Sequence, residues 1–189
     1  FDSYGNLQGT MTNSADPQNR SQVPLDEIPE TVRESVIAQE DASFYEHTGV
    51  NVRAILRAVD ANLESGDVSQ GGSTITQQVI KNSLVGDEES FSRKLREAFL
   101  AVELEKQMSK DEILERYLNS VYFGGGAYGV QAAAEYYFHK DAGELDWAEG
   151  AMLAALIRAP SEYDPFKNPE LALRRRSLVF RRLVETGKL

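Results

Sequence analysis

The chain has 189 residues, of which 41% are hydrophobic and 26% charged, so it can form one globular domain with a sizeable core. The lack of cysteine excludes disulfides and thiol catalysis, and with only two histidines a structural zinc site is not expected. A formal net charge of −10 argues against general nucleic-acid binding. If the substrate is anionic, the cations that bind it must be concentrated locally.

The N-terminal residues 1–27 are polar and contain several glycines and prolines, which predicts an extended lead-in segment without a core of its own. Residues 28–189 are expected to form the folded domain. Pro29 suits the first position of a helix, because the apolar residues after it recur at helical spacing. The same spacing from Val52 to Leu63 predicts a second helix, which Gly66 ends.

The middle of the chain predicts further helices. Thr74 and Gln77 have the spacing of a capping box at one helix start, and Ser109 and Glu112 have it at another. Between them lies a long amphipathic stripe, made up of Phe91, Leu95, Ala98, Phe99 and Val102. A small acidic loop precedes this stripe.

The C-terminal part is expected to be helical as well. The glycines at 124–126 predict a turn that allows close packing. The stretch Ala151–Ile157 is apolar on every side, which predicts a buried helix, and it is far shorter than the ~20 residues of a membrane-spanning helix. Pro169 can begin a last helix. Because no convincing strand alternation is present, we expect a compact, mainly α domain.

Glu40 is a candidate general base. It follows Val36 by four residues and Ile37 by three, so it lies on the apolar side of the first helix. A carboxyl group near the core should have a raised pKa, which suits a base near neutral pH. Spacing alone also allows a helix-end carboxylate that pairs with a nearby arginine.

Glu97 follows Arg93 by four residues and Lys94 by three. This spacing fits a surface ion-pair cluster of little energetic value, or a carboxylate held ionised by cations that also bind phosphate. Gln77, Gln78 and Lys81 share about one helical turn, and they could form an ordinary polar face. Alternatively, the carboxamides suit sugar hydroxyls and the lysine suits phosphate.

Two further groups have a structural interpretation. His47 is expected to be a hydrogen-bonded structural imidazole. The basic run at 174–176, with Arg181 and Arg182, is expected to be a solvated helix face.

Five short segments carry most of this chemistry. In chain order they are Glu40-Asp41-x-x-Phe44-x-x-His47-x-Gly49, Gly71-x-Ser73-Thr74-Ile75-Thr76-Gln77-Gln78-x-x-Lys81-Asn82, Arg93-Lys94-x-x-Glu97, Lys110-x-x-Ile113-Leu114-Glu115-x-Tyr117-Leu118-Asn119 and Ala159-Pro160-x-x-Tyr163-x-Pro165. Together they resemble the motifs of the peptidoglycan glycosyltransferase family, which occurs alone or as the first catalytic module of class A penicillin-binding proteins. The resemblance runs from about Val23 to the end.

The resemblance implies a lysozyme-like helical domain with a large lobe and a small membrane-facing jaw. It implies an inverting enzyme that polymerises lipid II into β-1,4-linked glycan strands and releases undecaprenyl pyrophosphate, with the growing lipid-linked glycan as donor. The implied location is the extracytoplasmic face of the bacterial cell membrane, with this chain an excised soluble domain. The jaw would include Leu84, Val85 and Phe91, and we expect residues 84–91 to be mobile without lipid.

By resemblance, Glu40 is the general base, while Glu97 assists at the leaving pyrophosphate with Lys81, Arg93 and Lys94. The other residues expected to line the cleft are Asp41, Ser73, Thr74, Gln77, Gln78 and Asn82. A divalent cation, Mg²⁺ or Mn²⁺, is expected without assigned ligands, and no organic cofactor. A donor-mimicking phosphoglycolipid such as moenomycin should bind. A transpeptidase module on the same full-length chain and cell-wall synthesis partners are also implied.

Two positions depart from the family pattern, Glu89 where a basic residue is common and His139 where glycine is usual.

Two other functions are alternatives to glycan polymerisation. A lysozyme-like glycan-cleaving enzyme would share the fold and one essential glutamate, but cleavage needs no pyrophosphate site. A non-catalytic helical binding module would not turn over lipid II.

Overall fold

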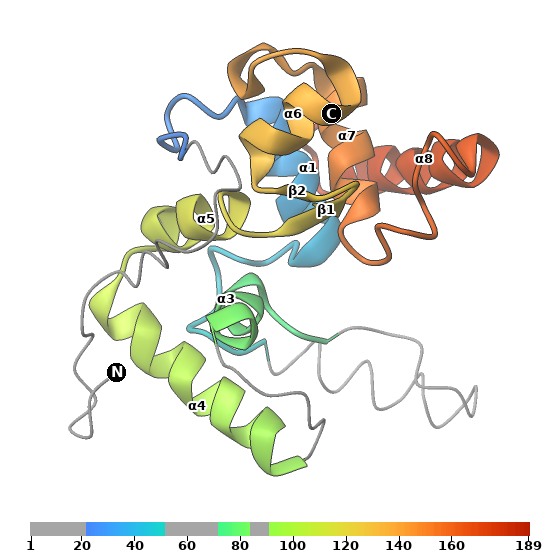
Figure 1. The fold of residues 1–189 in the computed structure, drawn as a ribbon. Helices are drawn as coiled ribbons and strands as arrows, with labels where there is room; N and C mark the ends of the chain where they lie inside the picture. The colour runs from blue at the N-terminus through green and yellow to red at the C-terminus, as the bar shows by residue number, and fades with distance from the viewer. Residues whose placement is uncertain (1–21, 52–71, 84–90) are drawn as a thin grey trace.

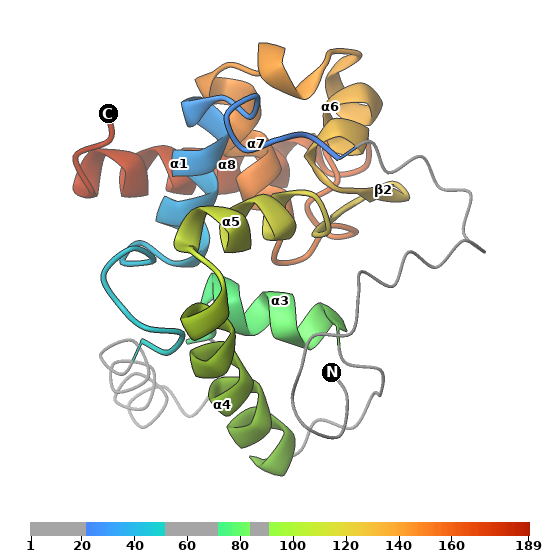
Figure 2. The same ribbon diagram turned by 90° about the vertical axis from the view of Figure 1, so that its left-hand side faces the viewer.

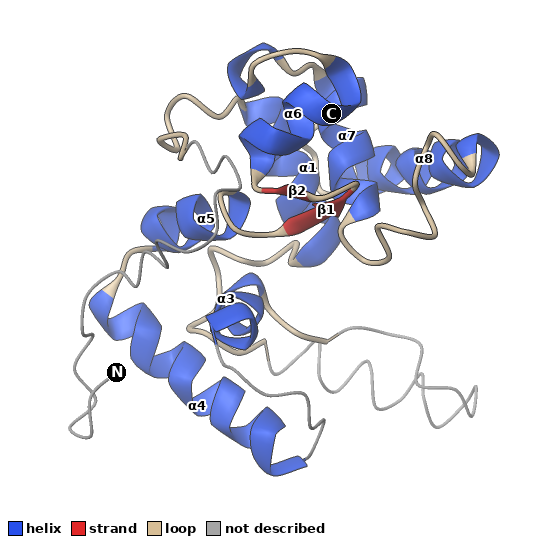
Figure 3. Ribbon diagram, in the orientation of Figure 1, coloured by secondary structure: helices blue, strands red, loops and turns tan. Residues whose placement is uncertain are grey.

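The structure is a computed structural model that describes residues 22–51, 72–83 and 91–189. In chain order its elements are α1 (Glu30–Glu40), α3 (Ile75–Ser83), α4 (Phe91–Gln107), α5 (Lys110–Leu118), β1 (Tyr122–Gly124), β2 (Ala127–Tyr128), α6 (Val130–Phe138), the 3₁₀ turn η1 (Ala142–Glu144), α7 (Trp147–Leu156) and α8 (Pro169–Glu185) (Figures 1 and 3). The mainly α architecture is confirmed. The helix predicted over 52–66 and the loop 84–90 lie outside the described residues.

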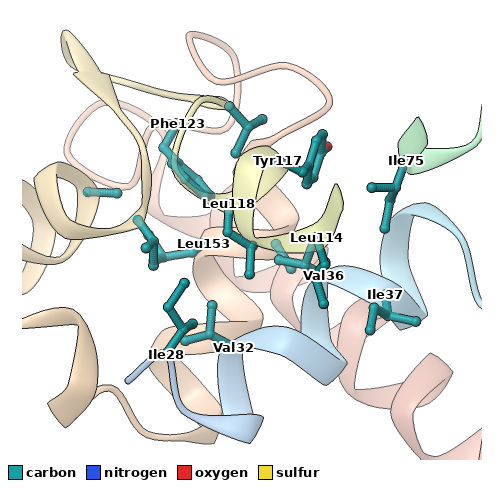
Figure 4. Packing of buried hydrophobic residues seen from close by; sticks show 14 of the residues in the cluster. Ile28, Val32, Val36, Ile37, Ile75, Leu114, Tyr117, Leu118, Phe123 and Leu153 are labelled. Atoms are coloured by element: carbon teal, nitrogen blue, oxygen red, sulfur yellow. The ribbon is translucent and has the colours of Figure 1, made fainter. Parts of the chain in front are cut away.

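The larger part of the fold, here called the main body, consists of α1, α5, α6, α7, α8 and the hairpin. Helix α7 packs against both α1 and α8, and the residues from Ala151 to Leu156 are all buried, as their apolar character predicted. At Gly150 an added Cβ would lie 2.7 Å from the Thr31 carbonyl oxygen, so glycine permits the close approach of α7 to α1. The core side chains labelled in Figure 4 come from α1, α3, α5, β1 and α7, with Ile28 from the segment before α1.

Helices α3 and α4 form a second layer beside the main body. Both views place α3 next to α4 and next to α5, and the contacts agree (Figures 1 and 2). The loop after α1 also reaches this layer, because a Cβ at Gly49 would lie 2.7 Å from the Ala101 backbone. Gly49 has φ +79°, a conformation that glycine adopts without strain.

Two large side chains of the amphipathic stripe predicted for α4 face away from the core. Leu95 and Phe99 are 58% and 65% exposed, whereas Glu97, Ala101 and Leu104 are buried. The buried face of α4 therefore carries a carboxylate, and the two large apolar side chains lie on the opposite face. Hydrophobicity alone could not show this, because a charged group occupies an inward position.

Two smaller expectations also need correction. The chain does contain strands, since β1 and β2 pair antiparallel with Tyr122 opposite Tyr128. Strands of three and two residues are too short to show alternation. The glycine turn predicted at 124–126 joins them, and all three glycines have positive φ. Helix α1 begins at Glu30, and Pro29 is its N-cap rather than its first helical residue.

The described end of the lead-in is joined to the main body. Val23 is buried and its amide donates to Asn119 Oδ1 at 2.8 Å, while the Leu25 amide donates to Glu115 Oε2 at 2.8 Å. The predicted boundary at residue 28 stays a prediction. Among the described helices, none has the length and apolar character required to cross a bilayer.

Candidate active site

Glu40 stands at the last residue of α1, where the main body meets α3. Its Oε2 accepts a hydrogen bond from Gln78 Nε2 at 2.9 Å. Burial raises the pKa of Glu40, and the hydrogen bond from Gln78 and the charges of Arg182 and Arg158 only partly oppose this effect. Within the described part of the chain, Glu40 forms no ion pair. The arrangement therefore fits a proton acceptor better than a helix-end carboxylate paired with arginine.

Asp41 is buried and its carboxylate connects two elements. Its Oδ2 accepts from the Ile75 amide at 3.1 Å, at the start of α3, and lies 2.8 Å from His47 Nε2. His47 Nδ1 in turn lies 3.5 Å from Lys110 Nζ. The prediction of a hydrogen-bonded structural His47 fits this geometry. Asp41, predicted to bind substrate, is placed so that it fixes α3 against the end of α1.

The start of α3 is the predicted capping box. The Thr74 amide donates to Gln77 Oε1 at 2.9 Å, and the Gln77 amide donates to Thr74 Oγ1 at 3.1 Å. Thr74 Oγ1 also donates to the Gly49 carbonyl at 2.7 Å. Both side chains are buried, so these two predicted substrate-binding residues act here on the protein scaffold.

Glu97 is buried on the inner face of α4, with its side chain 3% exposed. Arg93 Nε contacts one carboxylate oxygen at 3.0 Å and Lys94 Nζ the other at 3.1 Å. Lys94 Nζ also donates to Ser73 Oγ at 2.7 Å, which ties α4 to the segment before α3. The surface ion-pair interpretation of Glu97 is therefore wrong, because its carboxylate is buried. Each of its two oxygens contacts a cation, as a buried charge requires.

Helix α3 joins the two carboxylates. Gln78 on α3 contacts Glu40, and Ser73 just before α3 contacts the lysine that pairs with Glu97. Lys81 and Asn82 lie exposed on the last turn of α3. Most of the predicted residues thus form a Glu40 end and a cation end around Glu97, with the capping box between them. Within the described part of the chain, no hydrogen bond or ion pair joins Lys81 or Asn82 to either end.

Two residues that contact the neighbours of Glu40 were missed by sequence reasoning. Tyr117 on α5 is fully buried and donates to Gln78 Oε1 at 3.0 Å. Arg182 on α8 donates to the carbonyl of Gln39 and to its Oε1, the latter at 3.1 Å. The only signal for Tyr117 was its place in a motif on a buried stripe, where a hydroxyl needs a partner.

The C-terminal basic run is not uniformly a solvated face. Arg174 is exposed and pairs with Glu170, as a solvated face requires. Arg175 lies over the Tyr163 ring at 4.5 Å, and Arg182 holds the end of α1. The run therefore also anchors α8 to the main body.

A second ionic cluster joins α3, α4 and α5. Glu105 Oε1 accepts from Lys110 Nζ at 2.7 Å and from Thr76 Oγ1 at 2.5 Å. Lys110 also lies over the Phe44 ring at 4.5 Å. These contacts fix the α3–α4 layer to the main body on the side away from Lys94.

The structure explains one of the two departures. His139 is the C-cap of α6 and has φ +56°, the left-handed conformation that glycine adopts most easily. The usual glycine therefore fits the backbone, and histidine adopts it with some strain. Glu89 lies outside the described residues.

Residues 6–184 match the transglycosylase family. Over 187 residues the chain is 46% identical to penicillin-binding protein 1A of Aquifex aeolicus, covering 99% of this chain and 25% of that protein. It is 45% identical over 170 residues to penicillin-binding protein 1F of Bacillus subtilis, covering 90% of this chain and 24% of that protein.

Penicillin-binding protein 1A of Mycolicibacterium smegmatis is similar at 47% over 175 residues. The chain spans about a quarter of the length of these relatives. From the family match and these relatives, the chain belongs to the transglycosylase family and is a peptidoglycan glycosyltransferase domain of the class A penicillin-binding protein type.

Proposed function

We propose that this domain polymerises lipid II into β-1,4-linked glycan strands, with inversion and release of undecaprenyl pyrophosphate. One observation carries the proposal: α3 connects the partly buried carboxylate of Glu40 with the buried carboxylate of Glu97, and the two have different surroundings. Glu40 faces a neutral carboxamide, and Glu97 faces two cations. The first arrangement suits proton removal and the second suits a group that gains negative charge.

Glu40 is the proposed general base. It takes the proton from the 4-hydroxyl of the incoming lipid II as that oxygen attacks the anomeric carbon of the donor. The new C1–O4 bond forms as the bond from C1 to pyrophosphate breaks on the opposite side, which inverts the anomeric configuration. A raised pKa makes the Glu40 carboxylate a stronger base than an exposed one.

The cations beside Glu97 are proposed to receive the leaving pyrophosphate. Arg93 and Lys94 are held in place by Glu97, so they need no reorganisation when negative charge develops. Lys81 is exposed on the last turn of α3 and can approach the same group from the other side. Phosphate groups bind arginine through paired hydrogen bonds and lysine as a point charge.

A divalent cation is proposed to arrive with the substrate. Among the described residues, no group of three or more His, Asp or Glu side chains is arranged to hold a metal ion. Both oxygens of Glu97 already contact cations. A protein-held site does not fit these residues, and no step above depends on the metal.

The exposed apolar face of α4 supports docking at a membrane. Leu95 and Phe99 are more than half exposed, one helical turn apart. Burying such side chains in lipid is favourable by about 25 cal/mol per Å² of apolar surface. We propose that α4 rests on the extracytoplasmic face of the bacterial cell membrane, and that the full-length protein carries a transpeptidase module.

The proposed function is tested by product analysis. The domain is incubated with lipid II in detergent, with and without Mg²⁺, and the products are separated by gel electrophoresis. A ladder of long glycans sensitive to muramidase supports the proposal. Cleavage of a preformed glycan without polymer formation would support the lysozyme-like alternative, and no turnover in either assay would support a binding module.

A further inference from the structure

Two consecutive hydrogen bonds lead from the buried core to Glu40. The Tyr117 hydroxyl donates to Gln78 Oε1 at 3.0 Å, and Gln78 Nε2 donates to Glu40 Oε2 at 2.9 Å. Tyr117 on α5 is completely buried, and its ring lies in the same hydrophobic cluster as Ile75 (Figure 4). The three residues come from α5, α3 and α1, so their contact depends on the assembled fold.

A carboxamide can face a neighbour with either of its two ends. With its NH₂ toward Glu40, Gln78 stabilises the ionised carboxylate. With its carbonyl oxygen toward Glu40, it would repel the carboxylate and favour the protonated acid. The group that fixes the orientation of this carboxamide therefore determines how readily Glu40 is held as the ionised carboxylate, which is the form that can accept a proton.

We propose that Tyr117 is a positioning residue for the general base, because its hydroxyl fixes the Gln78 carboxamide with the NH₂ group toward Glu40. This inference rests on the proposed role of Glu40. Tyr117 touches neither substrate nor Glu40 in this arrangement, and it acts through Gln78 alone.

The Tyr117 hydroxyl is suited to this task because it remains a donor. Burial raises the pKa of Tyr117 well above its ordinary value, with smaller contributions from Glu40 and Asp41, so the proton stays on the oxygen. In the described chain Gln78 is its hydrogen-bond partner, and turning the carboxamide would leave the buried hydroxyl hydrogen without an acceptor. An unsatisfied buried donor is costly, so the observed orientation is strongly favoured.

The other groups that face Glu40 do not select the orientation of this carboxamide. Arg182 from α8 and Arg158 after α7 act on Glu40 by charge and lower its pKa, whereas the neighbouring Asp41 raises it. None of these residues has a hydrogen bond to Gln78 among the described contacts. Tyr117 is thus the residue through which the core controls the hydrogen bond to the base.

The test replaces Tyr117 with Phe, which keeps the ring and removes the hydroxyl. In Tyr117→Phe the carboxamide can turn, so the acidic limb of the pH profile of kcat/KM should move upward by roughly 0.5–1 pH unit. Turnover well above that limb should stay near wild type. The titration of the Glu40 carboxyl carbon, followed by NMR without substrate, should move upward by a similar amount.

Tyr137→Phe is the matched control, because Tyr137 is also buried and donates its hydroxyl to the Phe123 carbonyl at 3.0 Å. It should lower thermal stability without moving the acidic limb. A Tyr117→Phe profile that is lowered equally at every pH, or that matches Tyr137→Phe, would show a purely structural role and overturn the proposal.

Gln78→Met provides a second route if Tyr117→Phe folds poorly. It should move the Glu40 titration at least as far, and adding Tyr117→Phe to it should cause no further shift, because the two residues act in series. An unchanged titration in Gln78→Met overturns the inference. A moved NMR titration with an unmoved limb of turnover would instead contradict Glu40 as the base, which separates this failure from that of the proposed function.

Discussion

The two ends of the candidate site hold the same residue type in different ways. At one end Glu40 is partly buried beside a neutral carboxamide, with charged groups acting from farther away. At the other end Glu97 is buried between two cations on its own helix, four and three residues away. The difference teaches that burial alone does not define the role of a carboxylate. We propose that its partners decide whether it accepts a proton or arranges positive charge.

The two ends also differ in how they are built. The Glu40 end draws on α1, α3, α5 and α8, which are far apart in sequence. The Glu97 end is built mainly within α4, with Ser73 added from the segment before α3. A change in packing of the main body should therefore disturb the first end and leave the second largely intact.

Glu40→Gln should produce the largest effect of any single change. Loss of a general base lowers turnover by roughly 10²–10⁴-fold, while the fold is retained. The measurement is the initial rate of lipid II consumption. Glu103→Gln on α4 removes a surface carboxylate and serves as control. Near-full turnover in folded Glu40→Gln would break the assignment of the two ends.

Glu97→Gln should reduce turnover by about 10²-fold, because Arg93 and Lys94 lose the charge that orients them. This loss should be similar across the pH range, whereas a defect at the Glu40 end depends on pH. The pH profile of kcat/KM measures the difference. A shifted acidic limb in Glu97→Gln would mean that the two ends are not chemically distinct.

Lys81→Ala should weaken binding of a phosphoglycolipid donor mimic such as moenomycin by about 10-fold or more, since it removes a charge-assisted contact to phosphate. Isothermal titration calorimetry measures the affinity, and Lys106→Ala on the surface of α4 is the control. Unchanged affinity would remove Lys81 from the cation end.

Glu40→Gln should also stabilise the fold at alkaline pH. Partial burial raises the pKa of Glu40 from its ordinary value of 4.5, so ionising it in the folded state costs stability as the pH rises through the folded pKa. The variant should melt about 2 °C above wild type at pH 8, and the difference should vanish near pH 4. Thermal unfolding at both pH values measures this. A constant difference at all pH values would contradict the raised pKa.

His139→Gly should give the smallest effect, because it lies away from both ends. Relief of the left-handed backbone at the C-cap of α6, offset by the entropy of glycine, should raise the melting temperature by about 1 °C. Turnover and its pH profile should be unchanged. A lower melting temperature would show that the imidazole stabilises the turn.

Sequence reasoning reached the parts of the site that depend on local spacing. The apolar side of α1 placed Glu40 near the core, and the capping box of Thr74 and Gln77 was recognised from two residues. The approach of Arg93 and Lys94 to Glu97 also follows from helical spacing. These contacts form within one turn, so the sequence specifies them directly.

The remaining contacts depend on tertiary packing. Tyr117 and Gln78 are 39 residues apart, and Arg182 and Gln39 are 143 residues apart, so no local pattern could join them. The burial of Glu97 was also undecided, because its helix presents a charge inward. Each of these features appears only when α3 and α4 are placed against the main body.

The outward side chains of α4 make this helix a spacer. At 100° per residue, Leu95 and Phe99 project almost opposite to Glu97, which lies midway between them in sequence. A helix with its side chains is about 10–12 Å across. When Leu95 and Phe99 rest on the bilayer, as proposed, Arg93 and Lys94 are held about one helix width above it. In the proposed reaction, the thickness of a single helix would thus set the height at which a lipid-linked pyrophosphate meets its cations, and the lipid tail could stay in the membrane throughout.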